Sequence, residues 1–349
     1  MLSRLILVGL GNVGRSFLRV LDSQAPLLRT RYGREFIIVG ATDSAGAAFD
    51  PGGLDASAVL AAKERGDSVA SLPVVGHPGM SGLELVSSIQ ADAVLESTPV
   101  NLRTGQPGLD IVRAALRHGV PVVLANKGPL ALAYADLAAL SDLGDSTRPP
   151  LRFSACVGGA MPTINLGVRD LAGARILRVE AVLNGTTQYM LRAMEQGLRF
   201  AEVLADAKQR GLTETDPSLD VDGWDAAAKL VIVANAVLRQ PSTVADVAVE
   251  GITRVTPEML DHAARRIERL VLLCLAEPSG DSAGSFRLSV RPTALPLGHP
   301  LARMDGDEMG VVYHTDIAGR ASATSLERDP MPTAAAMLRD LLEITAPLA

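Results

Sequence analysis

A glycine pattern that follows a short apolar run constrains the fold of this chain more than any other feature. Residues 5–8 are all apolar, the sequence Gly9-Leu10-Gly11-Asn12-Val13-Gly14 follows at once, and Phe17, Leu18 and Leu21 come next at helical spacing. In such a turn the first glycine permits the sharp bend, the second lets a pyrophosphate approach the backbone, and the third allows close packing. The pattern predicts dinucleotide binding at Gly9, Gly11, Asn12, Val13 and Gly14. A glycine-rich turn in an unrelated α/β protein is the alternative.

Three further apolar runs continue the pattern of a parallel sheet. They comprise residues 36–39, 93–95 and 120–124, and they lead to Asp43, to Glu96-Ser97-Thr98 and to Asn126-Lys127. Between the last two runs, Leu109, Val112 and Leu116 mark an amphipathic helix. This alternation of strand and helix predicts an α/β fold with a Rossmann-type, doubly wound parallel sheet.

A change of composition marks the expected domain boundary. Residues 141–150 are rich in Ser, Asp, Gly and Thr and end in a Pro-Pro pair. Beyond them the pattern is mixed, with strands expected at 175–183 and 286–291 and helices at 201–209 and 226–238. We expect a dinucleotide-binding domain over residues 1–150 and a second, α+β domain over 151–330. A closing helix within 331–349 can pack back on the first domain or on the second, and the sequence does not choose.

Charge and cysteine content exclude several classes of protein. The net charge is -6 with both signs mixed along the 349 residues, which gives no support to a nucleic-acid or membrane-surface partner. The first apolar run is far shorter than the ~20 residues that span a bilayer. Cys156 and Cys274 are too few and too far apart for a disulfide framework or a zinc site. We therefore expect a cytoplasmic protein with buried, reduced thiols and a small-molecule substrate.

Asp43 is the candidate residue for selecting between NAD and NADP. An acidic residue at the end of the second strand selects NAD through the ribose hydroxyls, whereas a basic residue nearby suits the 2′-phosphate of NADP. Asp43 lies farther from Gly14 than is usual, so a role in fixing the following loop is the alternative. Lys63 could reach a phosphate, the alternative being an exposed helix lysine. The choice between NAD and NADP stays open.

Two lysines stand where chemistry is expected. Lys127 follows a predicted parallel strand, at the sheet edge where ligands of such folds bind, and the alternative is a solvated loop lysine. The acidic segment 214–225 leads into a helix on which Asp225 and Lys229 share one face. This segment predicts a carboxylate pocket for a substrate ammonium group with a lysine beside it. The alternatives are a surface ion pair and a calcium loop, although the glycine and the final glutamate of an EF-hand are misplaced.

Six motifs resemble those of homoserine dehydrogenases, in the same order. They are residues 9–14, Thr104-Gly105-Gln106-Pro107-Gly108, residues 123–129, residues 157–162, residues 183–189 and the acidic segment through Lys229. The likeness runs over most of the chain and is strongest from 96 to 238. It implies the reversible NAD(P)H-dependent reduction of L-aspartate 4-semialdehyde to L-homoserine, a step in threonine and methionine biosynthesis. It further implies a homodimer whose second domain binds substrate and dimerises.

The resemblance also implies roles for single residues. Lys229 donates the proton to the carbonyl oxygen, and Lys127 lies by the nicotinamide and the substrate. This suits the chemistry, because hydride delivery to an aldehyde develops charge on oxygen that an ammonium group can neutralise. Glu214 binds the amino acid, and Asp220 and Asp225 help to hold it, Asp225 being counted with the catalytic residues. The other implied contacts are Asn184, Gly185 and Thr186 for the substrate and Thr98 for the coenzyme.

A monovalent cation, Na⁺ or K⁺, is implied on main-chain oxygens of Val157, Gly159 and Met161. Two departures from the family stand against a full match. Ser154 replaces a glutamate of the cation loop, and residues 323–331 replace a glycine-rich stretch that lies near the cofactor. No kinase domain is expected before the chain and no regulatory domain after it, so feedback inhibition by threonine has no expected seat.

Two alternatives remain open because of these departures. One is another two-domain Rossmann dehydrogenase that acts on a small amino or keto acid. The other is a dinucleotide-binding sensor without catalysis. Retention of Lys127 and Lys229 argues against the sensor.

Overall fold

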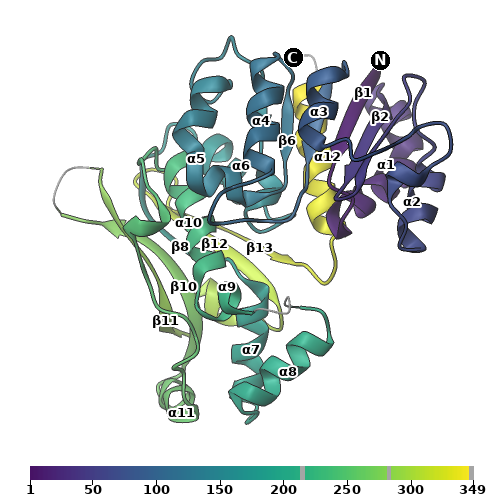
Figure 1. Cartoon of the computed structure of the whole chain (residues 1–349). Helices are drawn as coiled ribbons and strands as arrows, with labels where there is room; N and C mark the ends of the chain where they lie inside the picture. The colour runs from purple at the N-terminus through teal and green to yellow at the C-terminus, as the bar shows by residue number, and fades with distance from the viewer. Residues whose placement is uncertain (213–216, 281–283, 346–349) are drawn as a thin grey trace. The chain divides into compact units, whose positions relative to one another are not determined.

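A computed structural model of the chain describes residues 1–212, 217–280 and 284–345 (Figure 1). Backbone contacts divide it into two compact units. Unit 1 comprises residues 1–160 together with 329–349, and unit 2 comprises residues 161–328. The assignment of a coenzyme domain to 1–150 and of a substrate domain to 151–330 stays a prediction.

Unit 1 contains a seven-stranded sheet, which we call sheet A. Its order is β4-β3-β2-β1-β5-β6-β7. The strands are β1 (Leu2–Val8), β2 (Glu35–Asp43), β3 (Gly46–Phe49), β4 (Gly76–Pro78), β5 (Ala93–Glu96), β6 (Val122–Leu124) and β7 (Leu151–Arg152). From β2 to β7 all neighbours are parallel, whereas β3 and β4 are antiparallel additions at one edge. The predicted parallel sheet is confirmed, and the sequence analysis did not foresee the antiparallel edge.

The strand order of sheet A reverses at β1, because β2 lies on one side of β1 and β5 on the other. In open α/β sheets, ligands bind at the carboxyl ends of the strands that flank such a reversal. In the register, Val8 at the end of β1 lies opposite Glu96 at the end of β5. Glu96 in turn lies opposite Leu124 at the end of β6. The three strands therefore end at one common edge.

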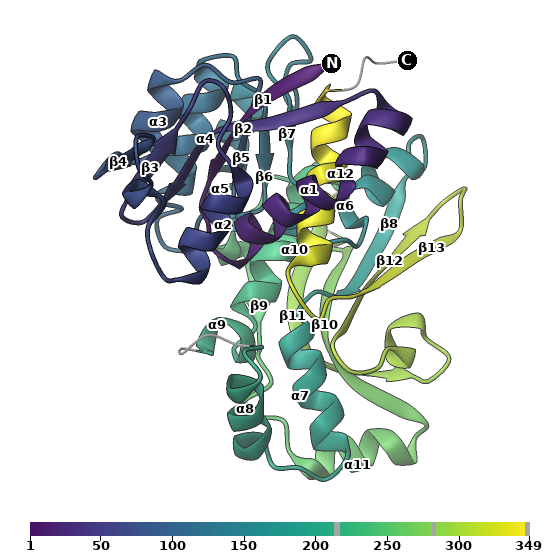
Figure 2. The same ribbon diagram turned by 90° about the vertical axis from the view of Figure 1, so that its right-hand side faces the viewer.

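Helices cover both faces of sheet A. They are α1 (Asn12–Tyr32), α2 (Ala56–Glu64), α3 (Gly82–Ser88), α4 (Gly108–Arg117), α5 (Lys127–Leu140) and α12 (Met331–Thr345). The last helix, α12, packs against α1 on one face, and α3, α4 and α5 form a row on the other (Figure 2). β1 and β5 are buried on both faces, which explains why they are continuously apolar rather than alternating. The last segment of the chain thus completes the core of unit 1.

Unit 2 is built on a six-stranded mixed sheet, sheet B, of order β13-β12-β8-β10-β11-β9. Its strands are β8 (Ile176–Val182), β9 (Val247–Val249), β10 (Glu268–Pro278), β11 (Phe286–Pro296), β12 (Glu308–Thr315) and β13 (Arg320–Leu326). Its helices are α6 (Thr163–Asn165), α7 (Gly185–Glu195), α8 (Phe200–Gln209), α9 (Ser218–Val221), α10 (Trp224–Ala236) and α11 (Pro257–Arg265). The strands expected at 175–183 and 286–291 and the helices expected at 201–209 and 226–238 correspond to β8, β11, α8 and α10. β10, β12 and β13 were not foreseen.

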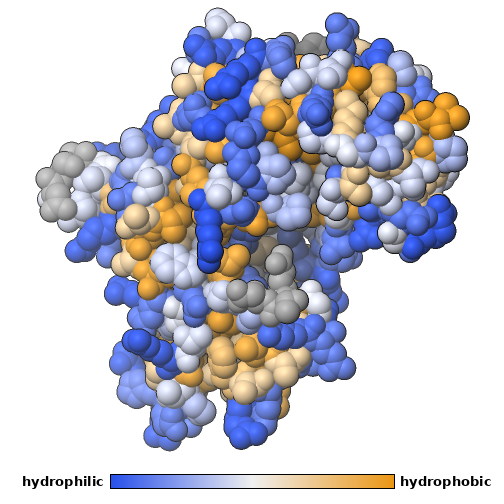
Figure 3. Space-filling model, viewed as in Figure 1, coloured by the Kyte–Doolittle hydropathy of each residue, from blue (hydrophilic) through white to orange (hydrophobic). Residues whose placement is uncertain are grey.

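Length and apolar character decide whether a helix could cross a membrane. Within the described ranges, no helix combines the length and the apolar character needed to cross a bilayer. On the face drawn in Figure 3, hydrophilic and apolar side chains are intermingled. Large exposed apolar side chains that occur singly are normal for folded proteins.

A buried carboxylate ties the 3₁₀ turn Ser154–Cys156 to α12. Asp340 is 0% exposed, and its Oδ2 accepts a hydrogen bond of 2.7 Å from the Ser154 amide. Burial raises the pKa of Asp340, and the hydrogen bonds from Ser154 act against this rise. The neighbouring Arg339 donates to the Ala160 carbonyl at 3.3 Å. Helix α12 therefore fixes both ends of the segment that leaves β7.

Replacing Asp340 with alanine should destabilise unit 1. The change removes the acceptor of a buried amide, which costs about 1–3 kcal/mol of unfolding free energy. Asp340→Asn should cost less, because its amide oxygen can accept the same hydrogen bond. Urea denaturation of the parent and both variants measures the difference. An alanine variant as stable as the parent would show that this contact contributes nothing.

Candidate active site

The glycine turn after β1 is required by close packing. Gly9 has φ of 95°, and a Cβ built there would lie 2.6 Å from the carbonyl carbon of Ser97. A Cβ on Gly14 would lie 2.0 Å from the carbonyl oxygen of Gly9. These positions admit only glycine because neither backbone can move away without breaking the contact between β1, β5 and α1.

Gly11 differs from its two neighbours, because a Cβ there would meet nothing within 4 Å. Gly11 is also the N-cap of α1 and makes no side-chain capping bond. The first amides of this 21-residue helix, at Asn12, Val13 and Gly14, have no acceptor within the helix. Open space in front of amide groups and the positive end of a helix dipole is what a pyrophosphate requires. The turn therefore fits a dinucleotide.

Asp43 ends β2, and its carboxylate is saturated with protein donors. It accepts from Lys63 Nζ at 2.7 Å, Ser68 Oγ at 2.7 Å, the Ala45 amide at 3.0 Å and the Val69 amide at 3.1 Å. Burial acts to raise the pKa of Asp43, but these hydrogen bonds outweigh it and lower the pKa. Asp43 thus fixes the loop after β2, as the alternative interpretation holds, and a ribose contact stays a prediction. Lys63 is not an exposed helix lysine, since its side chain is only 18% exposed.

A buried glutamate at the end of β5 was missed as a site residue. Glu96 is 0% exposed, and its Oε1 accepts from the Thr98 amide at 2.8 Å and from the Thr98 hydroxyl. Burial raises the pKa of Glu96 to about 7, although hydrogen bonds from Thr98 and Asn126 act against the rise. The one available signal was a carboxylate directly after an apolar parallel strand.

Asn126 joins this group to the start of α5. Its Nδ2 donates to Thr98 Oγ1 at 3.1 Å, and its Oδ1 accepts from the Gly128 amide at 3.0 Å as the N-cap of α5. Lys127, predicted to lie by the nicotinamide, is the first residue of that helix. A Cβ on Gly108 would lie 2.6 Å from Asn126 Nδ2 and 3.0 Å from Glu96 Oε2. This contact explains the final glycine of the 104–108 motif.

Unit 2 brings four of the predicted residues together. Asn184 Nδ2 donates to Asp220 Oδ1 at 2.7 Å and to Asp225 Oδ2 at 2.8 Å. Lys229 Nζ lies 2.9 Å from Asp225 Oδ2 and donates to the Leu183 carbonyl at 2.7 Å. The Lys229 side chain is only 15% exposed. Asp225 and Lys229 share one face of α10 because they lie four residues apart. Asn184 is the N-cap of α7, and its amide group meets the carboxylates of Asp220 and Asp225.

The remaining predicted substrate residues lie close to this group in the sequence. Gly185 and Thr186 begin α7, and Thr186 Oγ1 donates to the Leu212 carbonyl at 2.7 Å. A Cβ on Gly185 would lie 2.9 Å from the Asp307 carbonyl oxygen. Glu214 lies outside the described residues. Cys274 is buried nearby with a thiol pKa raised to about 12 by burial, so it is an inert core thiol.

The predicted cation donors are divided between the units. Val157 and Gly159 belong to unit 1, and Met161 belongs to unit 2. Among the described residues, no group of three or more His, Cys, Asp or Glu side chains could hold a metal ion. The Arg339 guanidinium already meets the Ala160 carbonyl between them. The predicted cation site on these main-chain oxygens therefore stays a prediction, and we derive no step through a cation.

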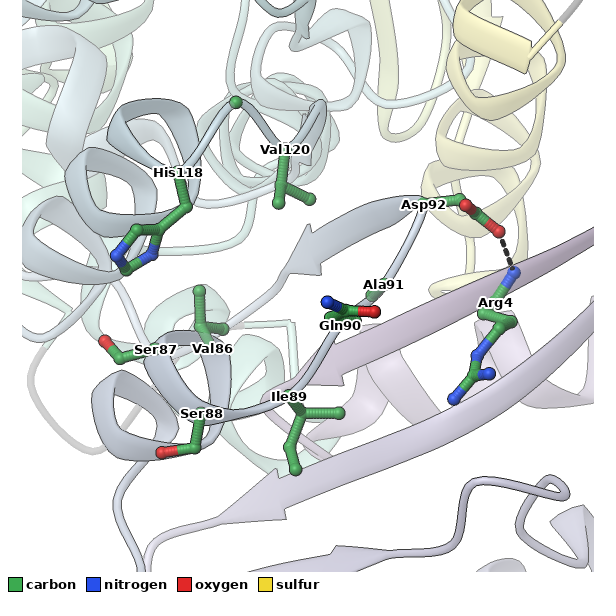
Figure 4. A pocket seen from close by; sticks show the side chains of 11 residues that line it. Arg4, Val86, Ser87, Ser88, Ile89, Gln90, Ala91, Asp92, His118 and Val120 are labelled. Carbon is green, nitrogen blue, oxygen red and sulfur yellow. Dashed lines mark hydrogen bonds between the residues drawn. The ribbon is translucent and has the colours of Figure 1, made fainter.

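A separate pocket of about 600 Å³ lies at the opposite edge of sheet A (Figure 4). It is formed at the start of β5 and the ends of α3 and α4, and its lining includes Arg4, Gln90, Asp92 and His118. Asp92 Oδ2 accepts from the Arg4 amide at 2.7 Å. None of the predicted site residues that the structure describes lines this pocket.

The fold and the side-chain groups define a class of protein. Unit 1 provides a dinucleotide turn at the reversal point of a Rossmann-type sheet, and unit 2 provides a lysine held between carboxylates. The combination is that of an oxidoreductase that uses a nicotinamide coenzyme.

Comparison with known proteins narrows this class to one family. The family model described as homoserine dehydrogenase matches residues 162–342. Homoserine dehydrogenase of Methanocaldococcus jannaschii is 38% identical over 97% of this chain and 98% of its own. The NAD(+)-dependent homoserine dehydrogenase of Pseudomonas canavaninivorans is 33% identical over 98% of this chain and 96% of its own. The chain belongs to the homoserine dehydrogenase family.

Solved structures agree with this assignment. A homoserine dehydrogenase from Thiobacillus denitrificans superimposes with a TM-score of 0.82 and 28% identity over 99% of this chain and 73% of that one. A homoserine dehydrogenase from Thermoplasma acidophilum superimposes with a TM-score of 0.82 and 26% sequence identity, over 99% of this chain and 99% of that one. The predicted family, fold class and NAD(P) coenzyme are therefore confirmed. The family's reaction is the reversible NAD(P)-dependent interconversion of L-aspartate 4-semialdehyde and L-homoserine.

Glu96 should make stability depend on pH. Its pKa is about 7 in the folded chain against 4.5 for an ordinary glutamate, so its favourable contribution is complete below about 4.5 and is lost as pH rises through 7. The full loss is about 3 kcal/mol. Glu96→Gln cannot ionise, so the stability of the parent relative to this variant should fall between pH 4.5 and 8.5.

Urea unfolding of both proteins at several pH values measures this difference. Glu84→Gln is the control, because hydrogen bonds that the exposed Glu84 accepts from Ser81 lower its pKa, so that it titrates below the window. A difference between parent and Glu96→Gln that does not change with pH would contradict the prediction.

Proposed function

We propose that this chain catalyses the family's reaction with Lys229 as the proton donor to the carbonyl oxygen of aspartate 4-semialdehyde. The observation that carries the proposal is the fixed position of the Lys229 ammonium group. It is largely buried, 2.9 Å from Asp225 and 2.7 Å from the Leu183 carbonyl. A positioned ammonium group can stabilise the charge that develops on the substrate oxygen.

The reduced nicotinamide, when bound, supplies the hydride to the carbonyl carbon. Lys229 then delivers a proton to the oxygen, and in the direction of homoserine oxidation it takes the proton from the hydroxyl group. Asp225 keeps the ammonium group in place through their 2.9 Å ion pair. Asn184 orients Asp225, since its Nδ2 donates to that carboxylate at 2.8 Å.

Carboxylates of the acidic segment are proposed to recognise the substrate's ammonium group. Asp220 lies beside Asp225 on the same Asn184 amide, and Glu214 precedes it along the chain. Gly185 and Thr186 follow that amide on α7. Their backbone and hydroxyl groups are proposed to hold the rest of the amino acid.

The coenzyme is proposed to bind in the domain of residues 1–150. Gly9, Gly11, Asn12, Val13 and Gly14 would hold the pyrophosphate, Asp43 the adenosine ribose, and Thr98 and Lys127 the nicotinamide end. The support is the open space at Gly11 in front of the first amides of α1. The domain of residues 151–330 would bind substrate and form a homodimer, which light scattering would test, and we propose a cytoplasmic location.

Assays with purified protein test the proposed function. Homoserine-dependent reduction of NAD and of NADP is expected, and the two rates give the coenzyme preference. Turnover of a different small amino or keto acid in place of homoserine would favour another two-domain dehydrogenase. Coenzyme binding without any turnover would favour a sensor.

Lys229→Ala should reduce kcat by about 10²–10⁴-fold, the usual contribution of a general acid, and leave coenzyme affinity nearly unchanged. Steady-state kinetics with homoserine and coenzyme titration measure both quantities. Lys208→Ala, on the exposed surface of α8 in the same unit, is the matched control. Turnover of Lys229→Ala within a few-fold of the parent would remove Lys229 from the proposed role.

Gly11→Val should weaken coenzyme binding without unfolding the protein. The added side chain occupies open space, so the fold accepts it, but it stands where the pyrophosphate would approach the backbone. We expect Kd to rise by about tenfold or more, which corresponds to ~1.4 kcal/mol. Gly14→Ala is the contrasting variant, because its Cβ would lie 2.0 Å from the Gly9 carbonyl oxygen and should lower stability itself. Unchanged affinity in a folded Gly11→Val variant would argue against a pyrophosphate at this turn.

A further inference from the structure

Glu96 is a buried carboxyl group at the point where sheet A reverses its strand order. It lies opposite Val8 on β1 and opposite Leu124 on β6. It is 0% exposed, and burying a carboxyl group costs free energy unless hydrogen bonds compensate for the lost hydration. Since Glu96 is enclosed, it can act only through the groups that it holds.

Those groups form a chain of hydrogen bonds that ends at the first turn of α5, which Lys127 begins. Glu96 Oε1 accepts both the amide and the hydroxyl proton of Thr98. The hydroxyl proton is thereby committed to Glu96, so Thr98 Oγ1 is left to accept the 3.1 Å bond from Asn126 Nδ2. The direction of that bond fixes which end of the Asn126 amide is the oxygen, and the oxygen caps α5 through the Gly128 amide at 3.0 Å. In the sequence, Lys127 lies between the capping residue Asn126 and Gly128.

The surroundings keep this arrangement in a single form. Gly108 approaches so closely that a Cβ there would lie 2.6 Å from Asn126 Nδ2 and 3.0 Å from Glu96 Oε2. Glu96 Oε2 itself has no hydrogen-bond partner among the described residues. Oε1 therefore accepts the hydrogen bonds from Thr98, and the Asn126 side chain acts on the same carboxyl group as a second, neutral neighbour.

We propose that Glu96 is a positioning residue for the nicotinamide end of the coenzyme site, which orients Thr98 directly and Lys127 through Asn126. This inference rests on the proposed function of unit 1 as the coenzyme domain. Loss of the Oε1 acceptor frees the Thr98 hydroxyl to rotate and lets the Asn126 amide turn over, so the cap of α5 is weakened. Misplacement of groups next to a reacting centre by about 1 Å reduces turnover by about 10²-fold.

The test compares Glu96→Ala with Glu96→Gln, because glutamine keeps an oxygen acceptor for Thr98 and alanine does not. The readouts are kcat with homoserine and the Kd values of two ligands, the whole coenzyme and its ADP-ribose fragment. We expect kcat of Glu96→Ala to fall by about 10–100-fold, in keeping with such a misplacement. In the parent, the whole coenzyme should bind more tightly than ADP-ribose because of its nicotinamide half. In Glu96→Ala this difference between the two Kd values should disappear, whereas the Kd of ADP-ribose itself should stay unchanged. Glu96→Gln should recover most of kcat.

Val94→Ala is the control for instability alone, since Val94 is a buried apolar residue of the same strand. It should lower the urea midpoint while kcat and both Kd values stay near those of the parent. Glu96→Ala kinetics that match those of Val94→Ala would overturn the inference, as would an equal loss of kcat in the glutamine and alanine variants. A parent protein that binds neither coenzyme nor ADP-ribose would instead refute the proposed coenzyme site itself.

Discussion

The steric contact between the turn after β1 and the end of β5 is the constraint on which the rest of unit 1 depends. Gly9 and Gly14 have no room for a side chain, since the Ser97 backbone and the Gly9 carbonyl oxygen lie 2.6 Å and 2.0 Å from where a Cβ would be. This contact brings the N-terminus of α1, the end of β5 and the end of β6 to one edge. Each group proposed to meet the coenzyme's reactive end follows one of these strands. A small displacement of the turn would therefore move the whole edge.

The two units position their lysines by the same physical device. In each, an asparagine caps a helix with its carbonyl oxygen and uses its amide group to hold other polar side chains: Asn126 bonds Thr98, and Asn184 bonds Asp220 and Asp225. Both asparagines are nearly fully buried, at 1% and 4% exposure. The side-chain amide of a buried capping asparagine has a fixed orientation, because a flip would bring its NH2 group against the backbone N–H that its oxygen now accepts from. The nearby lysines, Lys127 and Lys229, thus belong to rigid frames.

Local patterns predicted the parts of the fold that local forces determine. The glycine turn, the apolar strands β1, β5 and β6 and the amphipathic α4 have signals within a few residues, and so does the Asp225 and Lys229 pair on α10. β10 was missed although it is a long apolar run, because such a run can equally be a buried helix until its partners β8 and β11 are known. Glu96 was missed for a similar reason, since its function depends on Asn126, which follows 30 residues later. Asp340 lies 186 residues from the amide that it holds.

Three buried carboxyl groups accept hydrogen bonds that fix neighbouring parts of this architecture. Asp340 accepts from Ser154, Glu96 from Thr98, and Glu180 in sheet B accepts from His299 at 3.2 Å and His314 at 2.7 Å. Burial acts to raise the pKa of all three groups, and the pKa values of Asp340 and Glu96 are indeed raised. The pKa of Glu180 is lowered instead, because Arg178 and two histidines stabilise its carboxylate. Glu180 is therefore held as an anion by charged neighbours, whereas Glu96 has only neutral donors around it. The carboxyl group at the edge of sheet A can therefore exchange a proton near neutral pH, whereas Glu180 in sheet B stays ionised there.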